Sequence, residues 1–144
     1  MEINEALGYL LNTGSRLIKR RMDACLVEFD LTSTQWSVLK LLQEKKILTQ
    51  ARISEELLAD RATVCSVVAK LDQKGFIQKS PSPEDRRAFT ISLNDRAEKA
   101  VAAIESKAAT IIKTALGGIP DHEIQPLYHS LNRIINNLTG PFGP

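Results

Sequence analysis

The sequence has few of the residues on which most catalytic and metal sites depend. Its 144 residues include two histidines and two cysteines. It contains no glycine-rich phosphate loop, no HExxH zinc motif and no nucleophile elbow. Cys25 and Cys65 form no CxxC pair, so neither a disulfide framework nor a zinc knuckle is indicated. His122 and His129 would lie roughly 10 Å apart along a helix, too far to share one metal ion. We therefore expect no enzyme: no catalytic residues, no cofactor and no metal.

Long apolar runs and a large charge of one sign are also missing. No run approaches the roughly 20 apolar residues that a membrane span needs. The first residues, MEINEALGYLL, are acidic where a secretory signal would be basic. We expect a cytoplasmic protein with no membrane partner. The net charge of +2 indicates no nucleic acid by itself, so the argument must rest on where the charges lie.

What the sequence does have is helical periodicity. Apolar residues at helical spacing predict helices over 2–28, from Thr32 onward, and over 50–58 and 61–74. The spacing of Thr32 and Gln35 fits a capping box, Thr49 and Asp60 are candidate N-caps, and Gly75 is a stop signal.

Two further helices are predicted in the last third of the chain. Asn94 or Asp95 caps a long helix that reaches about Leu116, where Gly117, Gly118 and Pro120 interrupt the pattern. Either the last helix begins at Gln125 with Pro126 at its first position, or it bends at that proline.

A hairpin is predicted between the fourth and fifth helices. Residues 76–80 and 88–93 are β-prone and flank the proline-containing loop of "SPSPEDRRAFTISLND" (80–95). The predicted fold is mainly α with a small β-hairpin.

The fourth helix carries the most specific pattern. Val64, Val67, Val68 and Leu71 share one face and should pack inward. The opposite face has small and polar residues, namely Ala62, Ser66, Ala69 and Gln73, with Thr63 and Cys65 on its flanks. A helix with so little bulk can enter a major groove about 12 Å wide. Free backbone donors behind the Asp60 cap would suit a phosphate.

The hairpin loop gives a second candidate contact. Arg86 and Arg87 at its tip could enter a minor groove, with Asp85 bracing one guanidinium. Residues 61–89 carry six basic against three acidic side chains, a local charge of +3. The arginines could instead form a solvated turn. A helical protein-interaction module would leave the hairpin without a purpose.

Three stretches together resemble the MarR family of winged-helix regulators: "LTSTQWSVLKLL" (31–42), "DRATVCSVVAKLDQKGFI" (60–77) and "EDRRAFTISLNDRAEKAV" (84–101). The resemblance implies a homodimer that binds double-stranded DNA at a pseudo-palindromic operator, most often as a repressor. Within the single domain 1–144 it implies a winged helix-turn-helix lobe at 31–94 and dimerisation helices at 1–30 and 95–140. The residues that it places on DNA are Arg61, Thr63, Ser66, Lys70, Arg86 and Arg87.

The resemblance also implies an effector site, for which we expect a small aromatic or anionic molecule near Arg16, Arg20 and Trp36. Alternatively, Trp36 packs in the core or in a dimer interface, which its helical spacing favours.

A redox response through Cys25 or Cys65 is an alternative function, although Cys25 is expected to be a buried apolar residue. Leu58 replaces the glycine usual in the helix-turn-helix turn, which predicts a looser turn. Ser66 stands at a position where many members of the family have arginine.

Overall fold

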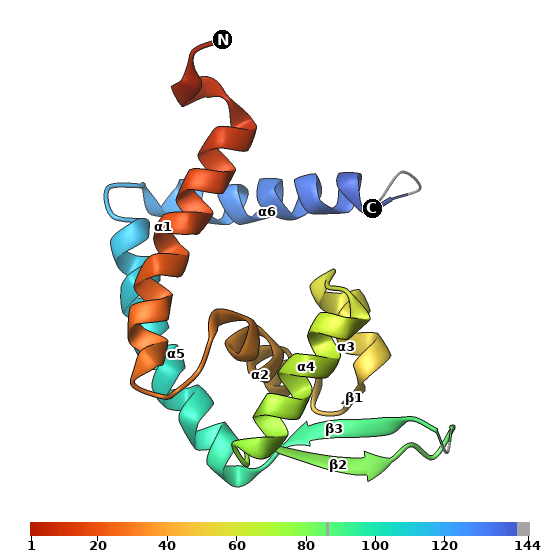
Figure 1. The fold of residues 1–144 in the computed structure, drawn as a ribbon. Helices are drawn as coiled ribbons and strands as arrows, with labels where there is room; N and C mark the ends of the chain where they lie inside the picture. Colours follow the sequence, from red (N-terminus) through yellow and green to blue (C-terminus); the bar gives the residue numbers. More distant parts are fainter. Residues whose placement is uncertain (86, 141–144) are drawn as a thin grey trace. The chain divides into compact units, whose positions relative to one another are not determined.

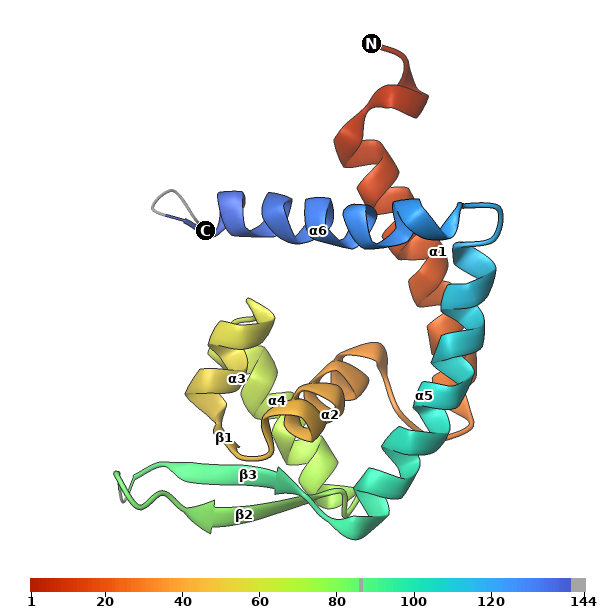
Figure 2. The ribbon, with the colours of Figure 1, turned by 180° about the vertical axis from the view of Figure 1, so that it is seen from behind.

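The computed structural model describes residues 1–85 and 87–140. In chain order the elements are η1 (Ile3–Glu5), α1 (Leu7–Val27), α2 (Ser33–Lys45), β1 (Leu48–Thr49), α3 (Gln50–Leu57), α4 (Arg61–Gln73), β2 (Ile77–Pro81), β3 (Phe89–Leu93), α5 (Asp95–Ala115) and α6 (Asp121–Leu138). The chain divides into two compact units, the first ending at Ile111 and the second beginning at Ile112. Figures 1 and 2 show the elements from opposite sides. No described helix is long and apolar enough to cross a membrane.

The sheet has three antiparallel strands in the order β1-β3-β2. The predicted hairpin is confirmed, with Ile77 opposite Leu93 at one end and Pro81 opposite Phe89 at the other. The third strand, β1, pairs Leu48 with Ile91. A strand of two residues shows no alternation, which is why periodicity did not predict it.

The predicted N-caps are confirmed. Thr32 and Gln35 form a capping box with hydrogen bonds of 3.1 and 3.2 Å. Thr49 accepts a hydrogen bond of 3.2 Å from the amide three residues on, and Asp60 one of 2.7 Å. Asn94 caps α5 in the same way at 2.9 Å. Polar caps therefore set the start of four helices, because they satisfy backbone donors that have no partner within the helix.

One predicted helix boundary is wrong, and for the last helix the structure excludes the alternative that starts at Gln125. The first helix begins at Leu7 and not at residue 2, because residues 3–5 form a separate 3-10 turn. The last helix begins at Asp121 directly after Pro120, so Pro126 lies inside it and not at its first position. Acidic residues in its first turn favour this earlier start, since negative charge stabilises a helix N-terminus.

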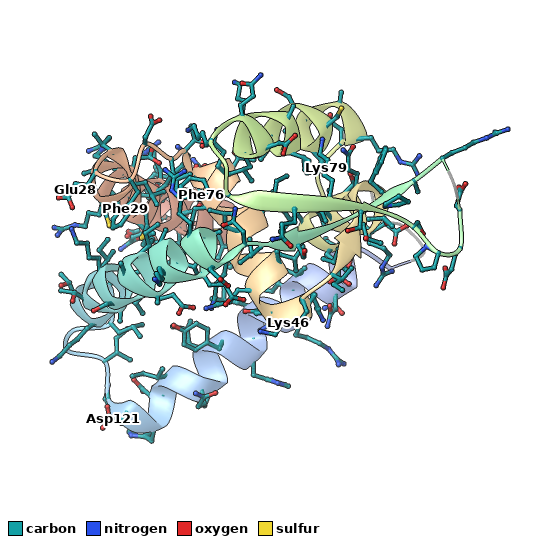
Figure 3. All side chains as sticks on the ribbon, turned by 90° about the horizontal axis from the view of Figure 1, so that it is seen from below. Glu28, Phe29, Lys46, Phe76, Lys79 and Asp121 are labelled. Atoms are coloured by element: carbon teal, nitrogen blue, oxygen red, sulfur yellow. The ribbon has the colours of Figure 1, made fainter. Side chains whose placement is uncertain are left out.

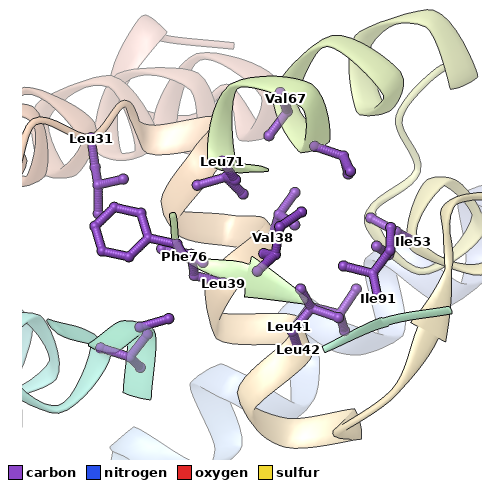
Figure 4. Close-up of a cluster of buried hydrophobic side chains, with 14 of the residues drawn as sticks. Leu31, Val38, Leu39, Leu41, Leu42, Ile53, Val67, Leu71, Phe76 and Ile91 are labelled. Atoms are coloured by element: carbon purple, nitrogen blue, oxygen red, sulfur yellow. The ribbon is translucent and has the colours of Figure 1, made fainter. Parts of the chain in front are cut away.

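The hydrophobic core lies in the first unit, where α2, α4, β3 and the first half of α5 meet (Figure 4). Its fully buried side chains include Leu39, Leu42, Ile53, Val68, Leu71, Ile91 and Ile104. Trp36 is half-buried against this core, as its spacing predicted. Cys25 is also half-buried, so the prediction that it is buried is wrong for the single chain.

Candidate nucleic-acid interface

The turn between α3 and α4 is closed despite the absence of glycine. Leu58 adopts the left-handed conformation, with φ 53° and ψ 39°. The amide of Ala59 donates to the carbonyl of Ser54 at 3.0 Å. The prediction of a looser turn is therefore wrong. Leucine takes the glycine conformation here at a cost of roughly 1 kcal/mol.

The two faces of α4 are oriented as predicted. Val64, Val67, Val68 and Leu71 are buried. The opposite side is exposed from end to end, and it carries Arg61, Ala62, Thr63, Cys65, Ser66, Ala69 and Lys70. Within residues 1–85 and 87–140 the side chains of Arg61, Ser66 and Lys70 form no hydrogen bond or ion pair. This face is therefore free to bind a ligand.

Thr63 differs from the other predicted contacts, because the Asp60 cap already engages it. Its hydroxyl donates to Asp60 Oδ2 at 2.8 Å, and its amide donates to Oδ1 at 2.7 Å. These bonds, the amide bond first, hold the pKa of Asp60 below its ordinary value. The carboxylate stays charged at the start of α4. It would repel a phosphate bound to the backbone amides of the first turn, which argues against the predicted backbone phosphate site there but not against a phosphate held by the longer Arg61 side chain.

The loop between β2 and β3, here called the wing loop, has hydrogen bonds of its own among its described residues, 82–85 and 87–88. The amide of Ser82 donates to the carbonyl of Ala88 at 3.0 Å, and the amide of Arg87 donates to Asp85 Oδ1 at 2.9 Å. Asp85 thus braces the loop backbone and, in the described part of the loop, not a guanidinium. The Arg87 side chain is exposed and makes no ion pair there. Arg86, the other predicted contact, lies outside the described residues.

A hollow that the sequence did not reveal lies between this loop and the start of α3. Its volume is about 460 Å³. The lining residues are Thr49, Gln50, Ala51, Ser82, Glu84, Asp85, Arg87, Ala88 and Phe89. They come from two segments far apart in the sequence, and no local pattern brings such segments together.

Several cations outside the α4 face and the wing tip form ion pairs, whereas others, such as Arg16 and Arg20, form none in the described chain. Lys19 bonds Asp23 at 2.8 Å, and Arg52 bonds both Glu55 and Glu56 at 2.9 Å. Lys40–Glu105, Lys107–Glu28 and Lys79–Asp72 are further pairs, and Figure 3 shows Lys79 on β2 and Glu28 at the end of α1. Arg61, Lys70 and Arg87 have no such carboxylate partner among the described residues. Their charge is therefore available to an outside anion.

Two of the three predicted effector residues, Arg16 and Arg20, line one hollow in the described chain, and Trp36 does not line that hollow. The hollow has a volume of about 230 Å³, and Arg16 and Arg20 border it together with Lys19 and Asp23, all on α1. Trp36 packs against the core instead. His122 and His129 are exposed on α6. Among the described residues, no three histidine, cysteine or acidic side chains are grouped as a metal site would require.

A pair of short helices with a closed turn, followed by a two-stranded wing, defines a winged helix-turn-helix lobe. Residues 31–89 match the model of the MarR family. The chain is 31% identical over 117 residues to the organic hydroperoxide resistance transcriptional regulator of Bacillus subtilis (strain 168), covering 81% of this chain and 77% of that one. The chain therefore belongs to the MarR family, which is a family of DNA-binding transcriptional regulators and not of enzymes.

Solved structures agree with this assignment. The S. aureus MepR–DNA complex is 26% identical, with a TM-score of 0.81 over 92% of this chain and 98% of that chain. A MarR protein from Peptoclostridium difficile DA00132 is 21% identical, with a TM-score of 0.87 over 99% of this chain and 95% of that chain. At that identity the second match shows the fold alone.

Proposed function

We propose that this regulator is a homodimeric repressor that binds a pseudo-palindromic operator and is released by a small molecule. One observation carries the proposal: the exposed face of α4 and the wing tip present Arg61, Lys70 and Arg87 without carboxylate partners among the described residues. An unpaired cation gains more from a phosphate than a paired one, because no existing ion pair has to break.

Homodimerisation is supported by α1 and α6. Within the described chain α6 buries none of its residues, and α1 buries one, Leu26. Their exposed apolar side chains include Leu7, Leu10, Leu11, Leu17, Leu127, Ile135 and Leu138. Residues 1–30 and 95–140 would thus be the dimerisation helices, and 31–94 the DNA-binding lobe. The dimer would hold two α4 helices about 34 Å apart, one turn of B-DNA.

The DNA contacts follow from position and chemistry. Arg61 and Lys70 would bind phosphates near the two ends of the α4 face, and Ser66 between them would reach a base edge. Arg86 and Arg87 would enter the adjacent minor groove. Thr63 could donate to DNA only by turning its hydroxyl away from Asp60, whereas it could accept from a base amino group as it stands.

Release would require a ligand that favours a different spacing of the two lobes. A small aromatic or anionic molecule is the expected class, because Arg16 and Arg20 border one hollow and form no ion pair in the described chain, where the neighbouring Asp23 pairs with Lys19. Trp36 remains the third proposed contact. Such a regulator would act in the cytoplasm, where the DNA lies.

A fluorescence-anisotropy titration tests the proposal. The DNA is the intergenic region beside the protein's own gene, cut into overlapping fragments, at two salt concentrations. We expect tight binding of one palindromic fragment by two chains, with an affinity that falls steeply with salt. Weak binding of all fragments, erased by salt, would contradict operator recognition there and favour a protein-interaction module.

A redox response is a second candidate. The similarity to an organic hydroperoxide resistance regulator favours it. Cys65 is exposed on the face of α4 that would meet DNA, and Cys25 is half-buried on α1. Oxidation of Cys65 would place a bulkier, more polar group against DNA. The same titration after treatment with an organic hydroperoxide, with Cys65→Ser and Cys25→Ser as matched variants, tests it. Unchanged wild-type affinity would exclude this candidate.

A further inference from the structure

The C-terminal end of α4 is tied to other elements by polar contacts. At this point α4 ends, β2 begins, and α5 starts alongside them (Figures 1 and 2). Lys74 is the C-cap of α4, and Gly75 with φ +75° turns the chain toward β2. We call Asp30, Gln35, Lys74, Asn94 and Arg96 the Lys74 junction.

The Lys74 ammonium group is occupied inside the protein. It donates to Gln35 Oε1 at 3.0 Å and to the backbone carbonyl of Asp30, and its Nζ lies 3.8 Å from Asp30 Oδ2. Gln35 is 3% exposed and uses the same oxygen to accept the amide of Thr32, so α4 is joined directly to the capping box of α2. The Lys74 side chain is 25% exposed. Its position is set by partners on two other segments.

The backbone of the same residues is held from α5. Arg96 donates to the carbonyl of Lys74 at 2.7 Å, and its guanidinium lies over the Phe76 ring at 4.8 Å. The side-chain amide nitrogen of Asn94 donates to the carbonyl of Gly75 at 2.6 Å, and the side-chain oxygen of Asn94 caps α5. Figure 3 shows Phe76 at the start of β2 within this region. The last carbonyls of α4, which have no partner in their own helix, thus bind the start of α5.

From these contacts we propose that Lys74 is a positioning residue for DNA reading: it sets the direction of α4 and does not itself bind DNA. The inference rests on the proposed function. From Arg61 to Gln73 the helix rises about 18 Å. A rotation of about 5° around its C-terminal end would move its first turn by about 1.6 Å, which is enough to break a hydrogen bond whose length tolerates only a few tenths of an ångström.

Lys70 is a matched control on the same helix, one turn before Lys74. It is exposed and makes no ion pair in the described chain. The Lys74 ammonium group, in contrast, has three neighbouring oxygen atoms, one from Gln35 and two from Asp30. Removing a phosphate contact lowers affinity for every DNA and reduces the salt slope by about one. Removing a positioning contact should lower affinity for the specific site alone and leave the salt slope unchanged.

The experiment compares Lys74→Met and Lys70→Met in the full-length protein by fluorescence anisotropy. One probe is a duplex carrying the site that the wild-type protein selects from randomised DNA, and the other is the same duplex with that site scrambled. Salt is varied between about 50 and 200 mM. We expect Lys74→Met to lose about tenfold in specific affinity, equal to one good base contact, with unchanged scrambled-DNA affinity and salt slope. Lys70→Met should weaken both complexes equally.

Two results would overturn the inference: a salt slope for Lys74→Met reduced by about one, which would place Lys74 on a phosphate, or affinities equal to those of the wild type. Arg96→Met, which removes the tie from α5 at an exposed site, provides a second test. We expect the same loss of specificity from it, and thermal unfolding must show both variants folded at the assay temperature. If the wild-type protein selects no site, the proposed function fails as well, which distinguishes that outcome from the other two.

Discussion

The helices α4 and α6 have the same apolar periodicity, but their apolar side chains differ in burial. In α4 the four residues Val64, Val67, Val68 and Leu71 are all buried. In α6 the apolar residues recur at the same spacing, yet Leu127 is 37% exposed, Ile135 50% and Leu138 67%. The pattern indicates in both cases that a face needs a partner. For α4 that partner is in the lobe, whereas α6 buries none of its described residues fully.

The difference has an energetic meaning. Burying a large aliphatic side chain contributes about 1.5–3 kcal/mol. Most of the stability of a helix within a protein comes from packing of its apolar face. The α4 stripe therefore stabilises the fold of the single chain, and the α6 stripe points to assembly.

The strongest test of this contrast removes one buried side chain from the lobe. Leu71 is 0% exposed, so Leu71→Ala should lower the free energy of unfolding by about 2–5 kcal/mol. Urea denaturation followed by circular dichroism measures the effect. Gln73→Ala, on the exposed face of the same helix, should stay within about 0.5 kcal/mol of the wild type. A similar loss from both variants would show that burial does not distinguish the two faces.

A second test targets α6. Ile135→Asp should dissociate the dimer, because a charge would replace an apolar group in the proposed interface. We expect half the mass by sedimentation equilibrium, with the lobe still folded. The control is His129→Asp, which adds the same charge to the polar side of α6 and should remain dimeric. Wild-type mass for both would remove α6 from the proposed interface.

A third test compares an unpaired cation with a paired one. Arg87→Ala should weaken DNA binding about tenfold and reduce the salt slope by about one. Arg52→Ala should change neither much, because Arg52 is already held by Glu55 and Glu56 at 2.9 Å. Anisotropy titrations at several salt concentrations measure both slopes. Equal losses would mean that internal pairing does not decide which cations reach DNA.

Much of the lobe could be predicted from local pattern. The Thr32–Gln35 capping box, the Asp60 cap and the inward face of α4 depend on residues within a turn or two of one another. The α4 face and Arg87 are exposed as predicted. Their binding to DNA remains a prediction, because only the nucleic acid itself could test it.

What the pattern missed depends on segments far apart in the sequence. β1 exists because Leu48 and Thr49 find an edge of β3 to pair with. The junction at Lys74 joins residues 30, 35, 74, 94 and 96, and neither periodicity nor propensity reports such distant contacts. Leu58 in a left-handed turn shows the converse. The Leu58 side chain is 59% exposed, so the left-handed conformation that its own preference disfavours comes with the backbone turn between α3 and α4 and not with burial of the leucine.

The smallest expected effect concerns how far along α5 the packing against the core extends. Only the first half of this helix buries side chains, namely Ala97, Val101 and Ile104. Next to them, Glu105 accepts hydrogen bonds from Lys40 and from Gln43 of α2, which hold its pKa below the ordinary value of 4.5. A lowered carboxyl pKa adds stability above the unfolded value, and this contribution is lost as pH falls through the folded value.

Glu105→Gln should therefore flatten the loss of stability between about pH 6 and pH 3. The effect should stay below about 1 kcal/mol, because the pair is partly exposed to solvent. Urea denaturation across that range measures it. Glu98→Gln is the control, since Glu98 lies exposed on the same helix without an ion pair in the described chain. Identical pH profiles for the wild type and Glu105→Gln would mean that this contact does not tie α5 to α2 in solution. The packing of α5 against the core would then end at Ile104, its last buried residue.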